Sequence, residues 1–195
     1  MPTLQEEIET ALLAAAKDPD EGVRQAAALA LEAWDTRRRV DDLCRALEDP
    51  SVAVQVRAAY ALGEVRDPRA TEGLIQILRS APADVRGIAI RLLGQRRDPR
   101  AIGPLMEALD DPSVDVRVLA VEALSGFQDV RLTEVFLAML SGAEEELKIK
   151  LLEVLVPLGD PRSVPAILPL LQDLSPTVRR LAAEALGQAE LPPTR

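Results

Sequence analysis

The sequence predicts an all-α solenoid, in which six repeats of 31 residues each fold as two helices and stack on one another. Two observations lead to this prediction. Apolar residues recur at a fixed interval of 31 along the chain, without insertion or deletion. The apolar residues are also almost all aliphatic, because the chain holds one Trp, one Tyr and two Phe. Such a composition favours close helix packing over a β-sandwich.

The interval is clearest in two columns of aliphatic residues. One column is leucine throughout: Leu31, Leu62, Leu93, Leu124, Leu155 and Leu186. The other column begins eight residues earlier and contains Val23, Val54, Val85, Val116, Leu147 and Val178. We therefore expect a single domain, residues 1–195, with repeats at 4–34, 35–65, 66–96, 97–127, 128–158 and 159–189 and a tail at 190–195.

Turn signals divide each repeat into two helical stretches, as the third repeat shows. Asp67 supplies a side chain that can cap a helix, and Pro68 follows at the position where proline is preferred. Apolar residues such as Leu74 and Leu78 then recur at helical spacing. Pro82 marks a second break, after which a second helix begins. Two helices this short cannot bury an apolar face alone, so stacking of neighbouring repeats is expected.

An arginine recurs near the start of the first helix in five repeats, at Arg38, Arg69, Arg100, Arg131 and Arg162. A cation in the first turn faces the positive end of the helix dipole, which is mildly unfavourable. We infer that an aspartate of the same or an adjacent turn compensates. The first repeat carries Glu7 at this position, as expected if the arginine reaches back to a preceding repeat.

Substitution Arg100→Ala tests this structural role. We expect a lower melting temperature, because the substitution removes a link within and between repeats. Thermal unfolding followed by circular dichroism measures the change. Loss of partner binding with unchanged stability would instead indicate that the arginine contacts a ligand.

Four short motifs carry a resemblance to a known family. They are Asp49-Pro50-Ser51-Val52-Ala53-Val54, Val85-Arg86, Ala61-Leu62-Gly63 and Asp98-Pro99-Arg100-Ala101-Ile102. These motifs resemble the short HEAT-like repeat named after phycobilisome lyase, and the resemblance covers about residues 4–189. It implies an α-solenoid of HEAT-like repeats whose second helices line a concave face.

The second helix of each repeat carries the candidate partner site. In the second repeat, Val54, Ala58 and Leu62 face inward, so the helical step places Val56 and Tyr60 outward. A patchy apolar strip bordered by charges of both signs is typical of a partner-binding surface. The alternative is that some of these residues pack between repeats. The candidate residues are Val56, Arg57, Tyr60, Ile88, Arg91, Val118, Leu119, Glu122, Ile149, Lys150, Glu153 and Arg180.

Charge and composition weigh against several other functions. The net charge of −9 and the scattered basic residues disfavour nucleic acid and anionic membrane surfaces. The absence of histidine removes Ser-His and Cys-His nucleophile pairs and histidine metal sites. A Gly-rich phosphate loop is also absent. We therefore expect no catalytic residues, no metal and no cofactor.

Cysteine content and the amino-terminal residues indicate where the protein works. Cys44 is the only cysteine, so an intrachain disulfide is excluded, and a buried small side chain is a better interpretation of it than a nucleophile. The amino-terminal residues lack the basic and apolar regions of a secretory signal, and no apolar run is long enough to span a bilayer. A cytoplasmic protein is the expectation.

The sequence leaves three functional hypotheses open. The first is a protein–protein interaction scaffold or adaptor that binds a protein or peptide on its concave face. The second rests on the family resemblance and is an accessory subunit of a bilin lyase, in which Arg57, Arg91 or Lys150 would hold a tetrapyrrole carboxylate. The third is weak self-association through the end repeats, because the last helix is followed by Leu191-Pro192-Pro193 without an evident polar cap.

Overall fold

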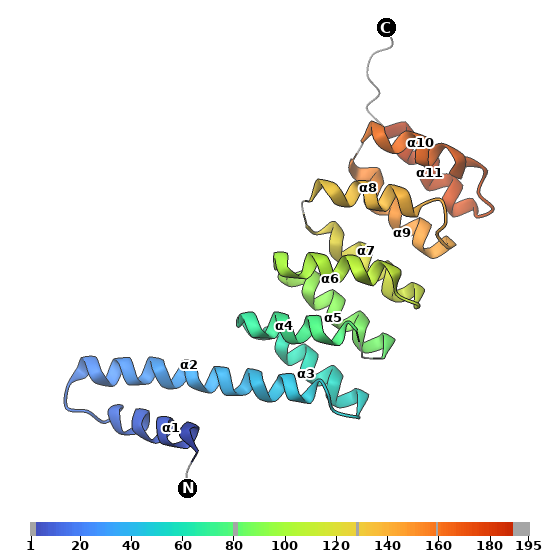
Figure 1. The fold of residues 1–195 in the computed structure, drawn as a ribbon. Helices are drawn as coiled ribbons and strands as arrows, with labels where there is room; N and C mark the ends of the chain where they lie inside the picture. The colour runs from blue at the N-terminus through green and yellow to red at the C-terminus, as the bar shows by residue number, and fades with distance from the viewer. Residues whose placement is uncertain (1–2, 80–81, 128, 159, 189–195) are drawn as a thin grey trace. The chain divides into compact units, whose positions relative to one another are not determined.

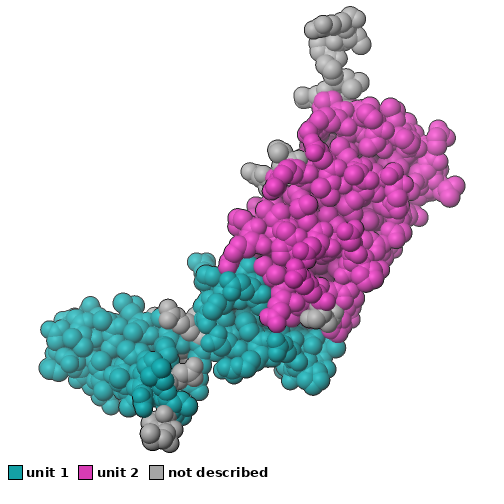
Figure 2. All heavy atoms as spheres, in the orientation of Figure 1, with its two compact units in different colours: residues 1–73 teal, residues 74–195 magenta. Residues whose placement is uncertain are grey.

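The fold is helical throughout the residues that the structure describes (Figure 1). A computed structural model describes residues 3–79, 82–127, 129–158 and 160–188, and no strand occurs within these ranges. The expected tail at 190–195 lies outside them. No helix in these ranges combines the length and the apolar character that crossing a bilayer requires. The chain divides into two compact units, Met1–Gly73 and Leu74–Arg195 (Figure 2).

Unit 1 holds three complete helices and the start of a fourth. The helices are α1 (Leu4–Ala15), α2 (Glu21–Ala46), α3 (Val52–Glu64) and the first residues of α4 (Pro68–Ile77). Thr3 caps α1 through a reciprocal pair of hydrogen bonds with Glu6, and the Asp20 carboxylate caps α2 by accepting from the Val23 N–H. Both helices therefore begin directly after a residue whose side-chain oxygen can accept a backbone hydrogen bond.

Unit 2 continues with paired helices, several of which begin or end in a 3₁₀ turn. The second helices of the repeats are α5 (Ala83–Arg96), α7 (Val114–Ser125), α9 (Glu145–Leu155) and α11 (Pro176–Gln188). The first helices are α6 (Ile102–Glu107) between η1 (Pro99–Ala101) and η2 (Ala108–Asp110), α8 (Val130–Met139), and α10 (Val164–Ile167) between η4 (Pro161–Ser163) and η5 (Leu168–Gln172). A further turn, η3 (Val156–Leu158), follows α9.

The leucine column lies at the centre of the packing. Its four interior members are buried, and its two members in the terminal repeats are half-buried. Burying one leucine side chain contributes about 1.5–3 kcal/mol, so the column is a major source of stability. The four interior leucines thus occupy equivalent places in the fold, and the predicted all-α repeat architecture is confirmed. The interior members are Leu62, Leu93, Leu124 and Leu155.

The arginine column is compensated as expected. The Asp98 carboxylate accepts from the Arg100 N–H at 3.0 Å and from the Arg100 guanidinium at 2.6 Å. The same two-residue arrangement recurs at Asp67, Asp129 and Asp160. Arginines of this column also reach an acid of the preceding repeat, as in the pairs Arg38–Glu9 at 3.3 Å, Arg69–Asp41 at 2.6 Å and Arg162–Glu134 at 3.5 Å. The predicted compensation is confirmed.

One expected repeat boundary lies within a helix. The boundary between the repeats at 4–34 and 35–65 is not marked by a turn, because α2 runs without interruption from Glu21 to Ala46. The junction at residues 32–39 contains neither glycine nor proline, whereas each later junction contains at least one of them. Thr36 and Arg37 occupy the positions of Asp67 and Pro68, so the proline that would start a new helix is missing and threonine, a weaker capping residue, replaces the aspartate.

Helices α5 and α7 approach each other closely at Gly94. A Cβ at Gly94 would lie 2.8 Å from Ala123 Cβ and 3.0 Å from Ala123 Cα. Two turns earlier on α5, a Cβ at Gly87 would meet only the end of the Leu119 side chain, at 2.9 Å. The backbone of α7 therefore limits position 94, whereas a movable side chain limits position 87.

Alanine substitutions should separate these two positions. We expect Gly94→Ala to lower the free energy of unfolding by about 1–2 kcal/mol, because overpacking against the Ala123 backbone outweighs the gain in helix propensity. Gly87→Ala should change it little, since the Leu119 side chain can rotate away. Urea unfolding measures both, with Gly187→Ala in α11 as the control, because nothing lies within 4 Å of a Cβ there. Stabilisation by Gly94→Ala would contradict the close approach.

Candidate functional site

The twelve predicted site residues lie on the second helices of five repeats, and they fall into two groups by exposure. The exposed group contains the aromatic residue and all but one of the charged residues: Arg57, Tyr60, Arg91, Glu122, Glu153 and Arg180. The half-buried group is apolar apart from one lysine: Val56, Ile88, Val118, Leu119, Ile149 and Lys150. The three residues on α3 belong to unit 1, and the other nine belong to unit 2.

Unit 2 brings three of the predicted residues together at one cleft. Arg91, Leu119 and Glu122 line an open cleft of about 450 Å³ between α5 and α7. Leu119 also lies over Gly87 of α5, so this side chain packs between repeats as well as facing the cleft. The half-buried apolar strip is therefore partly inter-repeat packing, and the exposed charges form its rim.

Arg97 also lines this cleft, and the sequence did not predict it. It ends α5 in a left-handed conformation, with φ 51° and ψ 33°. This conformation costs a non-glycine residue roughly 1–2 kcal/mol. Glycine is usual at a left-handed helix end. The sequence has Arg97 after Arg96 and no glycine there, so the residue type did not indicate this conformation.

A second, more apolar cleft in unit 2 was also missed. It has a volume of about 520 Å³ and lies at the end of α7, the first two turns of α8, the end of α9 and the turn η3. Phe127, Phe136 and Leu158 contribute apolar surface to it, and Glu153 is the only predicted site residue among its lining. Because the wall comes from several elements, the periodicity of one helix could not reveal it.

Ion pairs within single helices occupy several charges of the candidate site. Lys150 donates to Glu153 at 2.8 Å on α9, and Arg180 donates to Glu184 at 2.6 Å on α11. The hydrogen bond to Glu153 raises the pKa of Lys150 above its ordinary value, against the opposing effect of burial. Lys150 thus already binds a carboxylate. This ion pair disfavours the bilin-lyase alternative, in which Lys150 would bind a carboxylate of the tetrapyrrole.

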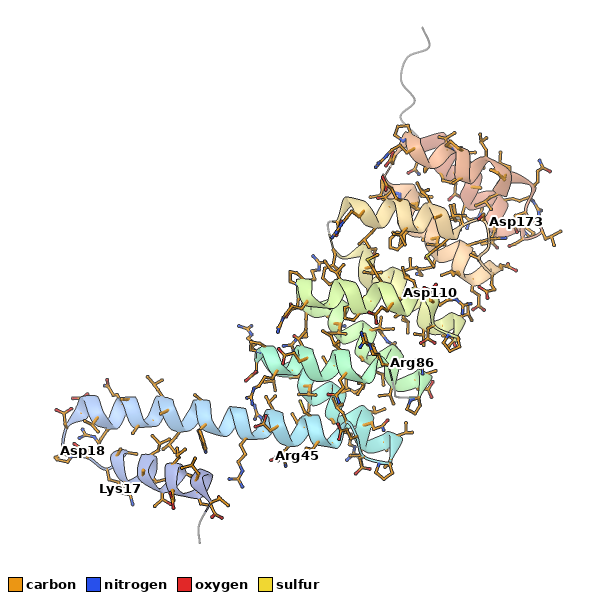
Figure 3. All side chains as sticks on the ribbon, in the orientation of Figure 1. Lys17, Asp18, Arg45, Arg86, Asp110 and Asp173 are labelled. Carbon is orange, nitrogen blue, oxygen red and sulfur yellow. The ribbon has the colours of Figure 1, made fainter. Side chains whose placement is uncertain are left out.

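Cations near the start of the second helices tie successive repeats together in unit 2. Both Arg86 on α5 and Lys148 on α9 bind the aspartate in the turn of the next repeat, and Figure 3 labels Arg86 and Asp173. The Arg86 guanidinium donates two hydrogen bonds of 2.7 Å to Asp111. Lys148 donates to Asp173 at 2.7 Å. These links fix the spacing of the helices that carry the candidate site.

The described part of the chain contains no cluster of three or more metal-ligating side chains. Cys44 is a free, half-buried thiol on α2. Burial and the neighbouring carboxylate of Asp41 raise its pKa, which lowers the fraction of reactive thiolate.

The family can be assigned by comparison with known proteins. Residues 9–82, 71–155 and 133–194 match the family model described as HEAT repeats. The chain belongs to the HEAT-repeat family. No curated protein sequence matches this HEAT-repeat chain.

Solved structures similar to this HEAT-repeat chain share its fold. The YibA protein of Escherichia coli is 18% identical, with a TM-score of 0.64, over 94% of this chain and 72% of YibA. A designed armadillo repeat protein in complex with the peptide (KR)4 is 17% identical, with a TM-score of 0.56, over 96% of this chain and 100% of that one. An engineered protein is 19% identical, with a TM-score of 0.55, over 94% and 96% of the two chains.

The Arg86–Asp111 pair should make stability depend on pH. Burial raises the pKa of Asp111, but hydrogen bonds from Arg86 and from the Ser113 N–H outweigh it, so the net shift is downward. A carboxylate with a lowered pKa stabilises the fold above its ordinary value of 3.8, and this contribution is lost as the pH falls below that value. We expect Arg86→Met to cost about 1–3 kcal/mol in urea unfolding at neutral pH, because Asp111 is left buried without its partner.

The cost of Arg86→Met should shrink as the pH falls below the ordinary aspartate value, since a protonated Asp111 needs no cation. Arg180→Met is the control, because Arg180 is 60% exposed and its pair lies within one helix. We expect that variant to change stability by less than about 0.5 kcal/mol. A cost for Arg86→Met that does not vary with pH would contradict the assignment.

Proposed function

We propose that this HEAT-repeat chain is a protein–protein interaction scaffold of the cytoplasm that binds a partner protein or peptide and has no catalytic role of its own. The binding face of unit 2 is formed by α5, α7, α9 and α11, which we take to line a concave surface, and α3 carries the equivalent face of unit 1. The observation that carries the proposal is the cleft between α5 and α7, which the apolar side chain of Leu119 lines together with the exposed charges of Arg91 and Glu122.

The chemistry of this face indicates what the partner must offer. The half-buried strip of Ile88, Val118 and Ile149 supports apolar side chains on the partner, and the rim supports charges of both signs. A peptide is a suitable class, because a designed armadillo repeat protein of similar fold is described in complex with a peptide. Tyr60 on α3 is 53% exposed and is our choice of aromatic anchor in unit 1.

We favour protein binding over the bilin-lyase alternative. Lys150, one of the three cations considered for a tetrapyrrole carboxylate, is bonded to Glu153. We therefore propose a peptide or a protein as the ligand, and not a tetrapyrrole.

A charge-reversed face variant tests the proposal. Ile88→Ser, Arg91→Glu and Glu122→Lys together alter the rim and the strip without changing net charge. We expect the affinity for a partner, identified by affinity purification and mass spectrometry and then measured by calorimetry, to fall at least about tenfold, or 1.4 kcal/mol. Far-ultraviolet circular dichroism should show unchanged helicity.

The matched control alters the first helices in the same chemical way. Met106→Ser, Arg79→Glu and Glu107→Lys replace one exposed apolar residue and reverse the charges of an exposed ion pair, which measures 2.9 Å in the unmodified protein. This control should bind the partner as the unmodified protein does. Equal binding by the face variant and the control would refute the proposed face.

A further inference from the structure

Exposed apolar side chains are concentrated in unit 1. Among the described residues, seven of the eleven large apolar side chains that are exposed lie there. The seven are Leu4, Leu13, Val23, Leu29, Val52, Val54 and Tyr60.

Val54 on α3 shows what is missing from this surface. It is 37% exposed, whereas its equivalents Val116, Leu147 and Val178 are 2%, 3% and 0% exposed. Val178 lies in the last repeat, so its burial comes from its own repeat and from the preceding one. Val54 has the same surroundings in the sequence but lacks the cover of a preceding repeat. The side of α3 that carries Val54 is therefore an unfilled stacking surface.

The uninterrupted helix α2 explains why this surface is unfilled. The residues that should stack before α3 are 4–34, which we call the amino-terminal arm. Because α2 continues through residues 34–37 without a turn, the arm extends along the helix axis instead of folding back on α3 (Figure 1). The arm and α3 thus keep complementary surfaces that do not meet within one chain.

A matching pair of charges points to the same contact. In unit 2, Arg86 binds Asp111 and Lys148 binds Asp173, each pair being 25 residues apart across a repeat interface. Arg24 and Asp49 have the same spacing and the same places in their repeats. In this chain Arg24 donates to the backbone carbonyls of Asp18 and Pro19, both at 2.8 Å. Arg117 makes the same two backbone bonds while it also binds Glu144 of the next repeat, so such bonds leave an arginine able to pair across an interface.

We propose that a second copy of this chain fills the surface by reciprocal exchange, so that the amino-terminal arm of each copy stacks on α3 of the other. The arm has the 31-residue register of the repeat that precedes α3. Within one chain, the continuous helix α2 holds the arm away from α3. Arg24 of one copy then meets Asp49 of the other, and Val54 is covered in both. Exchange of identical elements gives a closed dimer without any new kind of contact.

The first experiment measures mass by light scattering across a roughly hundredfold range of protein concentration. The unmodified protein should reach twice its monomer mass of 21.1 kDa. Thr36→Asp with Arg37→Pro restores the cap and proline of the other junctions, so the arm should fold back and the protein should stay monomeric. Thr36→Ala with Arg37→Ala keeps α2 helical and should remain dimeric.

A second pair of variants keeps the test valid if the proline variant fails to fold. Val54→Glu places a charge at a register that is buried in stacked repeats, so it should abolish the dimer at unchanged helicity. Val52→Glu is the control, because Glu21 and Glu145 occupy that register elsewhere, and it should remain dimeric. A monomeric unmodified protein at all concentrations, or a dimer that survives either Val54→Glu or the folded proline variant, would overturn the proposal.

Discussion

Short helices that cannot bury an apolar face alone impose the main constraint on this molecule. Each pair of helices leaves one side of its leucine, such as Leu93 or Leu124, to be covered by a neighbouring repeat. The interior leucines are buried and the terminal ones are only half-buried, as this dependence requires. The spacing of helices, the clefts between them and the exposed surface of unit 1 all follow from which repeats have neighbours.

Electrostatic links add direction to this packing. An aspartate starts the first helix in several repeats and binds the arginine two residues later, while the turn aspartates Asp111 and Asp173 bind cations of the preceding repeat. Part of the acidic excess of the chain therefore consists of carboxylates that form ion pairs within and between repeats. Because pairs such as Arg86–Asp111 are largely removed from solvent, they fix helix spacing more firmly than exposed pairs do.

The repeat architecture could be predicted because a 31-residue interval appears in many columns at once. The continuity of α2 could not be predicted in the same way, since alignment of the repeats supplies a boundary even where Thr36 and Arg37 replace the residues that make one. Helical spacing correctly separated the exposed Arg91 and Glu122 from the buried side chains. It could not show that Leu119 lies over Gly87, because that contact depends on how closely two helices approach.

The parts of the site that escaped prediction depend on backbone geometry and on several elements together. The left-handed conformation of Arg97 is a property of one helix end, and the apolar cleft beside Phe136 is formed by α7, α8 and α9 jointly. A single-sequence pattern records neither. Residues on one helix face are therefore predictable, whereas the shape of the surface between helices is not.

Helix α2 also acts as a lever within unit 1. A continuous ladder of backbone hydrogen bonds resists bending. The hairpin formed by α1 and the first half of α2 must therefore tilt together with the second half of α2, which packs before α3. At other junctions a proline or glycine allows the direction of the chain to change. The orientation of this hairpin is consequently set by helix propensity across residues 32–39, which contain neither glycine nor proline.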